Sequence, residues 1–147
     1  MITRPANADD IHDLAAIYRD FFLEDGITTE PEAIQTNLTL MLKDERACIF
    51  VCLVDEEIVG VSSGSITFGV EFGCAAELED LYIKPEHRGR GWARKLATAV
   101  LEWAESQGAT ETILVITPEA EADQGLTTFY RKLGFEDSKR ITMYRQN

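Results

Sequence analysis

LEDLYIKPEHRGRGWARKLA, residues 78–97, contains three elements in succession. The apolar run from Leu78 to Ile83 is suited to a buried strand, and Pro85 ends it. A basic turn with glycines follows, and the next residues predict a helix because apolar side chains recur on one face. These side chains are Trp92, Leu96, Ala97, Val100 and Trp103. The arrangement predicts an anion site, because the first N–H groups of a helix have no intrahelical partner and the helix dipole adds partial positive charge there.

The turn, His87 to Gly91, does not match the two commonest nucleotide-binding loops. A P-loop requires G-x-x-x-x-G-K-[ST], which is absent, and a dinucleotide-binding loop requires a third glycine where this chain has Arg94. The pattern that is present is R-x-x-G-x-A, formed by Arg88, Gly91 and Ala93. A glycine without a Cβ lets a phosphate reach the backbone, and arginine adds a full positive charge. An ordinary glycine turn before a helix is the alternative interpretation.

A second motif, FYRKLGF, spans Phe129 to Phe135 near the end of the chain. Its apolar side chains have helical spacing, and Gly134 is suited to end the helix. On this spacing alone, Tyr130 is either a core aromatic residue or a functional one.

The R-x-x-G-x-A turn and FYRKLGF together resemble the GNAT superfamily of N-acetyltransferases, and the resemblance covers nearly the whole chain. In that family the turn holds the pyrophosphate of coenzyme A, and the preceding strand pairs with the pantetheine arm through its backbone. The resemblance implies acetyl-CoA as acetyl donor and no metal, with Tyr130 protonating the departing thiolate. An asparagine is common in the family seven residues before this tyrosine, where this chain has Asp123. The cofactor-binding residues that the resemblance implies are Leu81, Tyr82, Ile83, Arg88, Gly89, Arg90, Gly91, Trp92, Ala93 and Asp123.

The length of 147 residues predicts one domain, residues 1–147, with a substantial core. Hydrophobic residues make up 45% and charged residues 27%, and no apolar stretch approaches the roughly 20 residues that span a bilayer. The N-terminal MITRPANADD lacks the apolar core of a signal peptide, so we expect a cytoplasmic protein. The three cysteines, Cys48, Cys52 and Cys74, lie in apolar surroundings and are expected to pack as small hydrophobes.

Apolar periodicity and turn residues predict the order β-α-α-β-β-β-α-β-α-β-β. The expected strands are 2–4, 47–54, 58–68, 75–83, 112–117, 135–138 and 141–145, with helices from about 9, 29, 92 and 126. Thr29 and Glu32 predict a capping box for the second helix, and Gly60 and Gly64 are expected to loosen their strand. Antiparallel pairs before the centre and a βα unit after it imply an α/β fold with a mixed sheet and helices on both faces. The family resemblance implies the same fold.

Transfer of an acetyl group to an amine requires a neutral nitrogen, so a carboxylate that accepts the proton is expected. Three candidates lie in the central strand: Glu77, Glu79 and Asp80. Period-2 alternation places Glu77 and Glu79 on one face and Asp80 on the other, unless a bulge intervenes. Glu79 is the preferred base because it is closer to the expected end of the pantetheine, and Leu78-Glu79-Asp80 resembles the LED triplet of polyamine acetyltransferases. Glu77 is the alternative, at the spacing used by histone-type members.

The net charge of −12 argues against a nucleic acid partner and permits a cationic one, although solubility alone would also explain it. In the family the acceptor lies where this chain carries acidic residues. We therefore expect a polycationic small molecule, an aminoglycoside first and a polyamine second, with a protein or peptide amine as the alternative. A non-catalytic acetyl-CoA sensor is another alternative, and a homodimer is allowed. The acidic residues expected at the substrate are Glu24, Asp25, Glu77, Asp80, Glu136 and Asp137.

Overall fold

The computed structural model describes all residues, 1–147, and divides into two compact units, Met1–Val115 and Ile116–Asn147. The prediction of a single domain stays a prediction. None of the helices has both the length and the apolar character needed to cross a bilayer.

The first unit contains β1 (Ile2–Pro5), η1 (Ala8–Asp10), α1 (Ile11–Glu24), α2 (Pro31–Lys43), β2 (Ala47–Val54), β3 (Glu57–Gly69), β4 (Gly73–Ile83), η2 (Pro85–His87), α3 (Trp92–Ser106) and β5 (Thr112–Ile113). The second unit contains α4 (Pro118–Gln124) and α5 (Leu126–Arg131).

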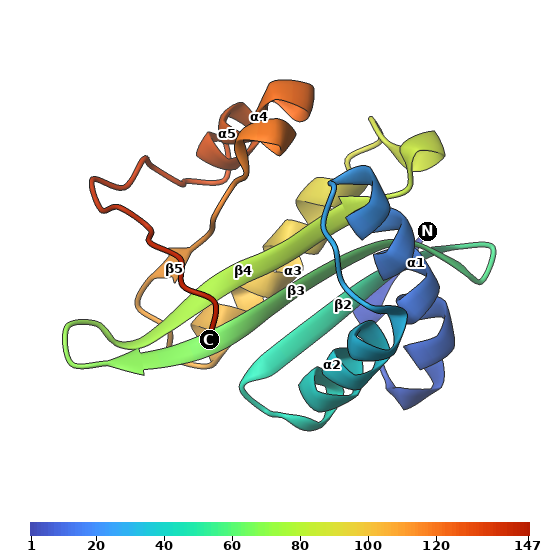
Figure 1. Ribbon diagram of the computed structural model, residues 1–147, viewed down its shortest axis with the longest axis horizontal. Helices are drawn as coiled ribbons and strands as arrows, with labels where there is room; N and C mark the ends of the chain where they lie inside the picture. The colour runs from blue at the N-terminus through green and yellow to red at the C-terminus, as the bar shows by residue number, and fades with distance from the viewer. The chain divides into compact units, whose positions relative to one another are not determined.

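The first unit is a five-stranded mixed sheet in the order β1-β2-β3-β4-β5. The first four strands pair antiparallel with their neighbours, and β5 runs parallel to β4 after the crossover through α3. Helices α1 and α2 cover one face of this sheet, and α3 covers the other (Figure 1). The α/β fold with a mixed sheet and helices on both faces, predicted from the sequence, is confirmed for this unit.

Both faces of the sheet are closed by apolar side chains. On the face of α1 and α2, the core includes Leu14, Tyr18 and Phe21 of α1 together with Val51 and Val61 of the sheet. On the face of α3, a second cluster is formed by Cys52, Val59, Ile83 and Leu96. Cys48 and Cys52 are buried, as predicted for thiols that pack as small hydrophobes, whereas Cys74 is only partly buried.

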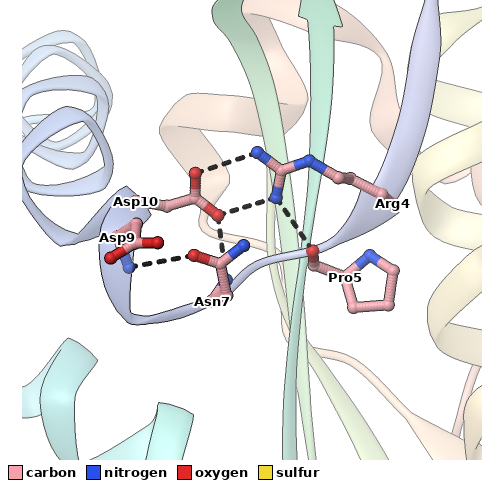
Figure 2. Close-up of polar contacts among 5 residues, drawn as sticks. All are labelled: Arg4, Pro5, Asn7, Asp9 and Asp10. Atoms are coloured by element: carbon pink, nitrogen blue, oxygen red, sulfur yellow. Dashed lines mark hydrogen bonds and ion pairs between the residues drawn. The ribbon is translucent and has the colours of Figure 1, made fainter.

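The short helix η1, which leads directly into α1, begins at a network of polar contacts around Asp10 (Figure 2). The backbone N–H of Asn7 donates to Asp10 Oδ2 at 2.8 Å, and the Asn7 side chain accepts from the N–H of Asp9 at 2.9 Å. The Arg4 guanidinium donates to both carboxylate oxygens of Asp10, at 2.7 and 2.9 Å. This reciprocal capping box satisfies N–H groups that would otherwise have no partner, and the arginine ties the helix start to β1.

The capping box predicted at Thr29 and Glu32 is wrong. Helix α2 is preceded by Glu30 in an extended conformation, φ −62° and ψ 138°, and no side chain caps the helix. The reason is Pro31, which favours an extended residue before it and itself fits the first helical position. The helix therefore begins one residue later than a cap at Thr29 requires.

Two further predictions on strands are corrected. The strand expected at 112–117 pairs with β4 only at Thr112 and Ile113, and the hairpin expected at 135–138 and 141–145 contains no strand. In that segment Ile141, Met143 and Tyr144 are exposed. A two-stranded hairpin without further partners is at best marginally stable in water, so β propensity alone does not make a strand here.

The glycines of β3 have a packing role that the sequence did not indicate. Gly60, Ser62 and Gly64 alternate on the face of the sheet that carries α3, and Ser62 Oγ donates to the carbonyl of Leu96 at 3.0 Å. A Cβ at Gly60 would lie 2.5 Å from Ile83 Cδ1, and one at Gly64 would lie 2.7 Å from a methyl group of Val100. Small residues here let α3 approach the sheet closely.

Gly64→Ala is expected to destabilise the protein by about 1–3 kcal/mol, the range for overpacking a core. The new methyl group would also lie 3.0 Å from the carbonyl oxygen of Glu77, which is backbone and cannot rotate away. The midpoint of urea unfolding measures the effect. Gly69→Ala is the matched control, because a Cβ there has nothing within 4 Å. Equal midpoints for the two variants would contradict the close-packing interpretation.

Candidate active site

The turn before α3 has the conformation that its glycines predict. Gly89 and Gly91 have φ of 78° and 83°, in the left-handed region that favours glycine. Gly91 directly precedes α3, and no side chain caps this helix. No backbone carbonyl or capping side chain accepts from the N–H groups of Trp92, Ala93 and Arg94. These three donors, with the positive end of the helix dipole, can hold a phosphate.

The surroundings of the turn fit an extended ligand with a phosphate group. A Cβ built at Gly89 or Gly91 meets no atom within 4 Å, so the space over the turn is open. Strand β5 pairs with β4 only at Ala76 and Glu77, so no strand pairs with this edge of β4 from Leu78 to Ile83. An unpaired strand edge presents backbone N–H and C=O groups to a ligand.

The Arg88 side chain is held by residues outside the turn. Its Nη1 and Nη2 donate to the two carboxylate oxygens of Glu24, at 2.9 and 2.8 Å, and its Nε donates to the carbonyl of Ile83 at 2.8 Å. The guanidinium also lies over the Tyr82 ring, 5.4 Å from its centroid. The structure thus joins Arg88, predicted at the cofactor, to Glu24, predicted at the substrate. This pairing argues against both assignments, because each group neutralises the charge of the other.

The carboxylates of β4 lie on a single face because of a bulge. Ser63 of β3 pairs with Asp80, but its neighbour Gly64 pairs with Leu78, so Glu79 is the extra residue. Ser63 Oγ donates to Asp80 Oδ2 at 2.6 Å, and Ser65 Oγ donates to Glu79 Oε1 at 2.8 Å. Ser63 and Ser65 are two residues apart in a regular strand and share a face.

Glu77 belongs to the same face, because it pairs directly with Ser65. The alternation placed Asp80 on the opposite face from Glu77 and Glu79 unless a bulge intervened, and the structure contains that bulge. Without the bulge, side-chain alternation would have separated them. The structure instead gathers Glu77, Glu79 and Asp80 on the face that also carries α1.

Burial and mutual repulsion disfavour charge on two of these groups. Burial is the main cause that raises the pKa of Asp80, and it outweighs the hydrogen bonds from Ser63 and Tyr18. The Tyr18 hydroxyl donates to Asp80 Oδ2 at 3.0 Å. Burial, followed by the charges of Glu79 and Asp80, raises the pKa of Glu77. Carboxyl groups with raised pKa values in one cluster are typical of acid–base sites.

The second unit holds Tyr130, which is buried on helix α5. Its ring contacts those of Phe129 and Phe135, with centroids 5.0 and 5.7 Å apart. The N–H of Phe135 donates to the carbonyl of Tyr130, the N–H of Gly134 donates to that of Arg131, and Gly134 has φ of 95°. This is the Schellman arrangement, so the predicted role of Gly134 in ending the helix is confirmed.

The other three predicted residues of this unit, Asp123, Glu136 and Asp137, are exposed. Asp123 lies on α4, a helix that the side chain of Thr117 caps. Asp137 receives two hydrogen bonds from Arg131 Nη2, at 2.8 and 2.9 Å. An arginine partner argues against Asp137 as a binding charge for a cation.

Tyr18, Ser63 and Ser65 were not predicted as site residues. Tyr18 has the helical spacing of a core aromatic, and the serines of β3 carry no motif. A hydroxyl at a buried position was the only available signal, since a buried Tyr O–H or Ser O–H requires a partner. The partners, Glu79 and Asp80, become apparent only once β3 and β4 are in register.

The first unit combines a turn whose unpartnered N–H groups can hold a phosphate with an unpaired edge of β4 and a face of carboxylates. The chain matches the acetyltransferase (GNAT) family over residues 11–135. It therefore belongs to the GNAT family and is an acetyl-CoA-dependent N-acetyltransferase, as the sequence motifs indicated.

The chain is similar to proteins that are named as acetyltransferases. An aminoglycoside N(6')-acetyltransferase type 1 of Salmonella typhimurium strain LT2 is 28% identical over 110 residues, which cover 72% of this chain and 74% of that protein. An uncharacterized N-acetyltransferase of Archaeoglobus fulgidus is 30% identical over 108 residues, covering 71% and 74%. The solved structure of aminoglycoside N-acetyltransferase AAC(6')-Iy with the bisubstrate analogue CoA-S-monomethyl-acetylneamine has the same fold. Its TM-score is 0.83 at 22% identity, with 99% of this chain and 97% of that chain covered.

Proposed function

We propose that the protein transfers an acetyl group from acetyl-CoA to a primary amine of a polycationic small molecule, an aminoglycoside first and a polyamine second. The observation that carries this proposal is the convergence of Glu77, Glu79 and Asp80 on one face of β4. Three carboxylates with no arginine or lysine ion pair among them favour a ligand with several ammonium groups. The aminoglycoside acetyltransferases among the relatives support the same substrate class.

Glu79 is the residue that we propose as general base. Its side chain is exposed, and the hydroxyl of Ser65 holds one of its oxygens, which leaves the other available to an amine or a bridging water. An alkyl ammonium group with a pKa of about 10.4 must lose a proton before its nitrogen can attack. Proton acceptance by a positioned carboxylate removes this barrier. Asp80 is held by Ser63 and Tyr18, so we assign it to the wall of the acceptor site.

Acetyl-CoA supplies the thioester whose acetyl group is transferred. The N–H groups of Trp92, Ala93 and Arg94 hold its phosphates in this proposal, and the open edge of β4 pairs with its extended arm. The extra residue of a bulge is left out of the strand ladder, so the backbone N–H of Glu79 is suited to polarise a thioester carbonyl. Tyr130 donates a proton to the leaving sulfur.

Thiol release from acetyl-CoA with a panel of amines tests the function. The panel contains an aminoglycoside, a polyamine, a single amino acid and a peptide with a free N-terminus. We expect the highest kcat/KM with the aminoglycoside and a lower one with the polyamine. Preference for the peptide would overturn the polycation proposal, and the absence of turnover with every amine would favour a sensor.

Binding of a polycation should depend on salt. Asp25→Asn is expected to raise KM for the aminoglycoside and leave kcat nearly unchanged, because the substitution removes a negative charge from a predicted substrate residue and no group assigned to proton transfer. The difference in KM should shrink between about 0.01 and 1 M salt, as the Debye length falls from roughly 30 to 3 Å. Asp137→Asn is the matched control, since Arg131 already neutralises Asp137. KM values that do not respond to salt would contradict the proposal.

A further inference from the structure

The two ends of helix α1 are held by the same kind of contact. At its start, Arg4 makes a bidentate ion pair with Asp10, and at its end, Arg88 makes a bidentate ion pair with Glu24. The helix is 14 residues long, so the two pairs are separated by about 20 Å along its axis. The first pair joins α1 to β1, whereas the second joins α1 to the turn that precedes α3.

Arg88 is held from three sides. Glu24 accepts from both of its terminal nitrogens, the carbonyl of Ile83 accepts from its Nε, and the Tyr82 ring lies beneath its guanidinium. The Tyr82 ring in turn stacks on Phe21 of α1, with centroids 5.0 Å apart and an angle of 14° between the planes. Side chains of both pair members are about one-third exposed, 33% for Arg88 and 35% for Glu24. Arg88 is therefore packed between the end of β4 and the end of α1.

We propose that Glu24 is a positioning residue for the cofactor: it holds Arg88, and Arg88 holds the backbone of the turn, Gly89 to Gly91, in the shape that binds phosphate. The chain reverses between Ile83 and Arg88, and the Nε contact to the Ile83 carbonyl closes this loop. Glu24 fixes the guanidinium that makes the contact. This inference rests on the proposed placement of the coenzyme A phosphates at the turn.

The direction of the change in coenzyme A affinity distinguishes positioning from simple charge repulsion. If Glu24 acted only as a nearby negative charge, Glu24→Gln would tighten binding of the anionic coenzyme A. If Glu24 positions Arg88, the same substitution weakens binding, because the guanidinium loses its bidentate partner. We expect roughly a tenfold rise in the Kd of coenzyme A by calorimetry, from the loss of hydrogen bonds between charged groups. In kinetics, KM for acetyl-CoA should rise and kcat should change little.

A double-variant cycle completes the experiment. Arg88→Gln should weaken coenzyme A binding to the same extent as Glu24→Gln, and the double variant should be no worse than either one, because both remove one interaction. Asp10→Asn is the matched control: it breaks the equivalent pair at the other end of α1, so it should lower Tm by a few degrees without changing the Kd.

Three results would overturn the inference, and they differ from one another. An unchanged or lower Kd for Glu24→Gln, with a higher Kd for Arg88→Gln, would mean that Arg88 binds phosphate directly. A higher Kd for Asp10→Asn would mean that any loosening of α1 has the same effect. A folded Gly91→Val variant that binds coenzyme A normally would show that the turn is not the phosphate site, and would remove both the placement and the positioning pair.

Discussion

Glu79→Gln is expected to lower kcat for an aminoglycoside by roughly 10²-fold to 10⁴-fold at pH 7, the range for loss of a general base. Glutamine keeps the length of the side chain and can still accept the hydrogen bond from Ser65. It cannot accept a proton from an ammonium group. The variant can therefore use only the small fraction of amine that is already neutral. Below an amine pKa of about 10.4, this fraction increases about tenfold for each unit by which the pH rises. The defect should be largest at low pH and should shrink steadily toward pH 10.

The matched control is Glu77→Gln, which changes the same chemical group on the same face of β4. It should raise KM for the amine and leave kcat nearly unchanged. Full pH profiles of kcat and kcat/KM for the two variants separate the roles. If Glu77→Gln abolishes turnover while Glu79→Gln changes only KM, the base is Glu77, and a pH-independent defect in Glu79→Gln would point to lost binding geometry.

Tyr130→Phe is expected to lower kcat by about 10-fold to 10³-fold, with little change in KM for acetyl-CoA. The phenylalanine ring keeps the contacts with Phe129 and Phe135, and only the proton donor is removed. Steady-state release of the thiol measures the rate, and Tm measured in parallel shows whether the packing is intact.

Tyr144→Phe is the control for this substitution, because Tyr144 is exposed and its hydroxyl is not assigned a role. It should behave as the unmodified enzyme in both kcat and Tm. A normal kcat for Tyr130→Phe would mean that Tyr130 is a core aromatic residue and not the proton donor. A lower kcat accompanied by a large fall in Tm would indicate a packing defect.

The parts of the fold that follow from consecutive residues could be predicted from the sequence. The turn before α3 is an example, because Gly89 and Gly91 allow positive φ and the apolar stripe from Trp92 onward specifies the helix. The chain also forms β2 at the bounds its apolar run predicts, 47–54. Strands that need partners were less predictable, since the closing hairpin has suitable residues and no neighbouring strand to pair with.

The sequence by itself determined the family, the order of the elements up to β5, and which residue types are available to the site. Only the tertiary structure decided how these residues meet. The bulge at Glu79 exists because β3 and β4 are in a particular register, and this one extra residue moves Asp80 to the face of Glu77. Arg88 and Glu24 are 64 positions apart, and Asp80 and Tyr18 are 62 apart. Side-chain periodicity describes one element at a time, whereas contacts of this kind depend on how α1 packs against the sheet, which no local pattern encodes.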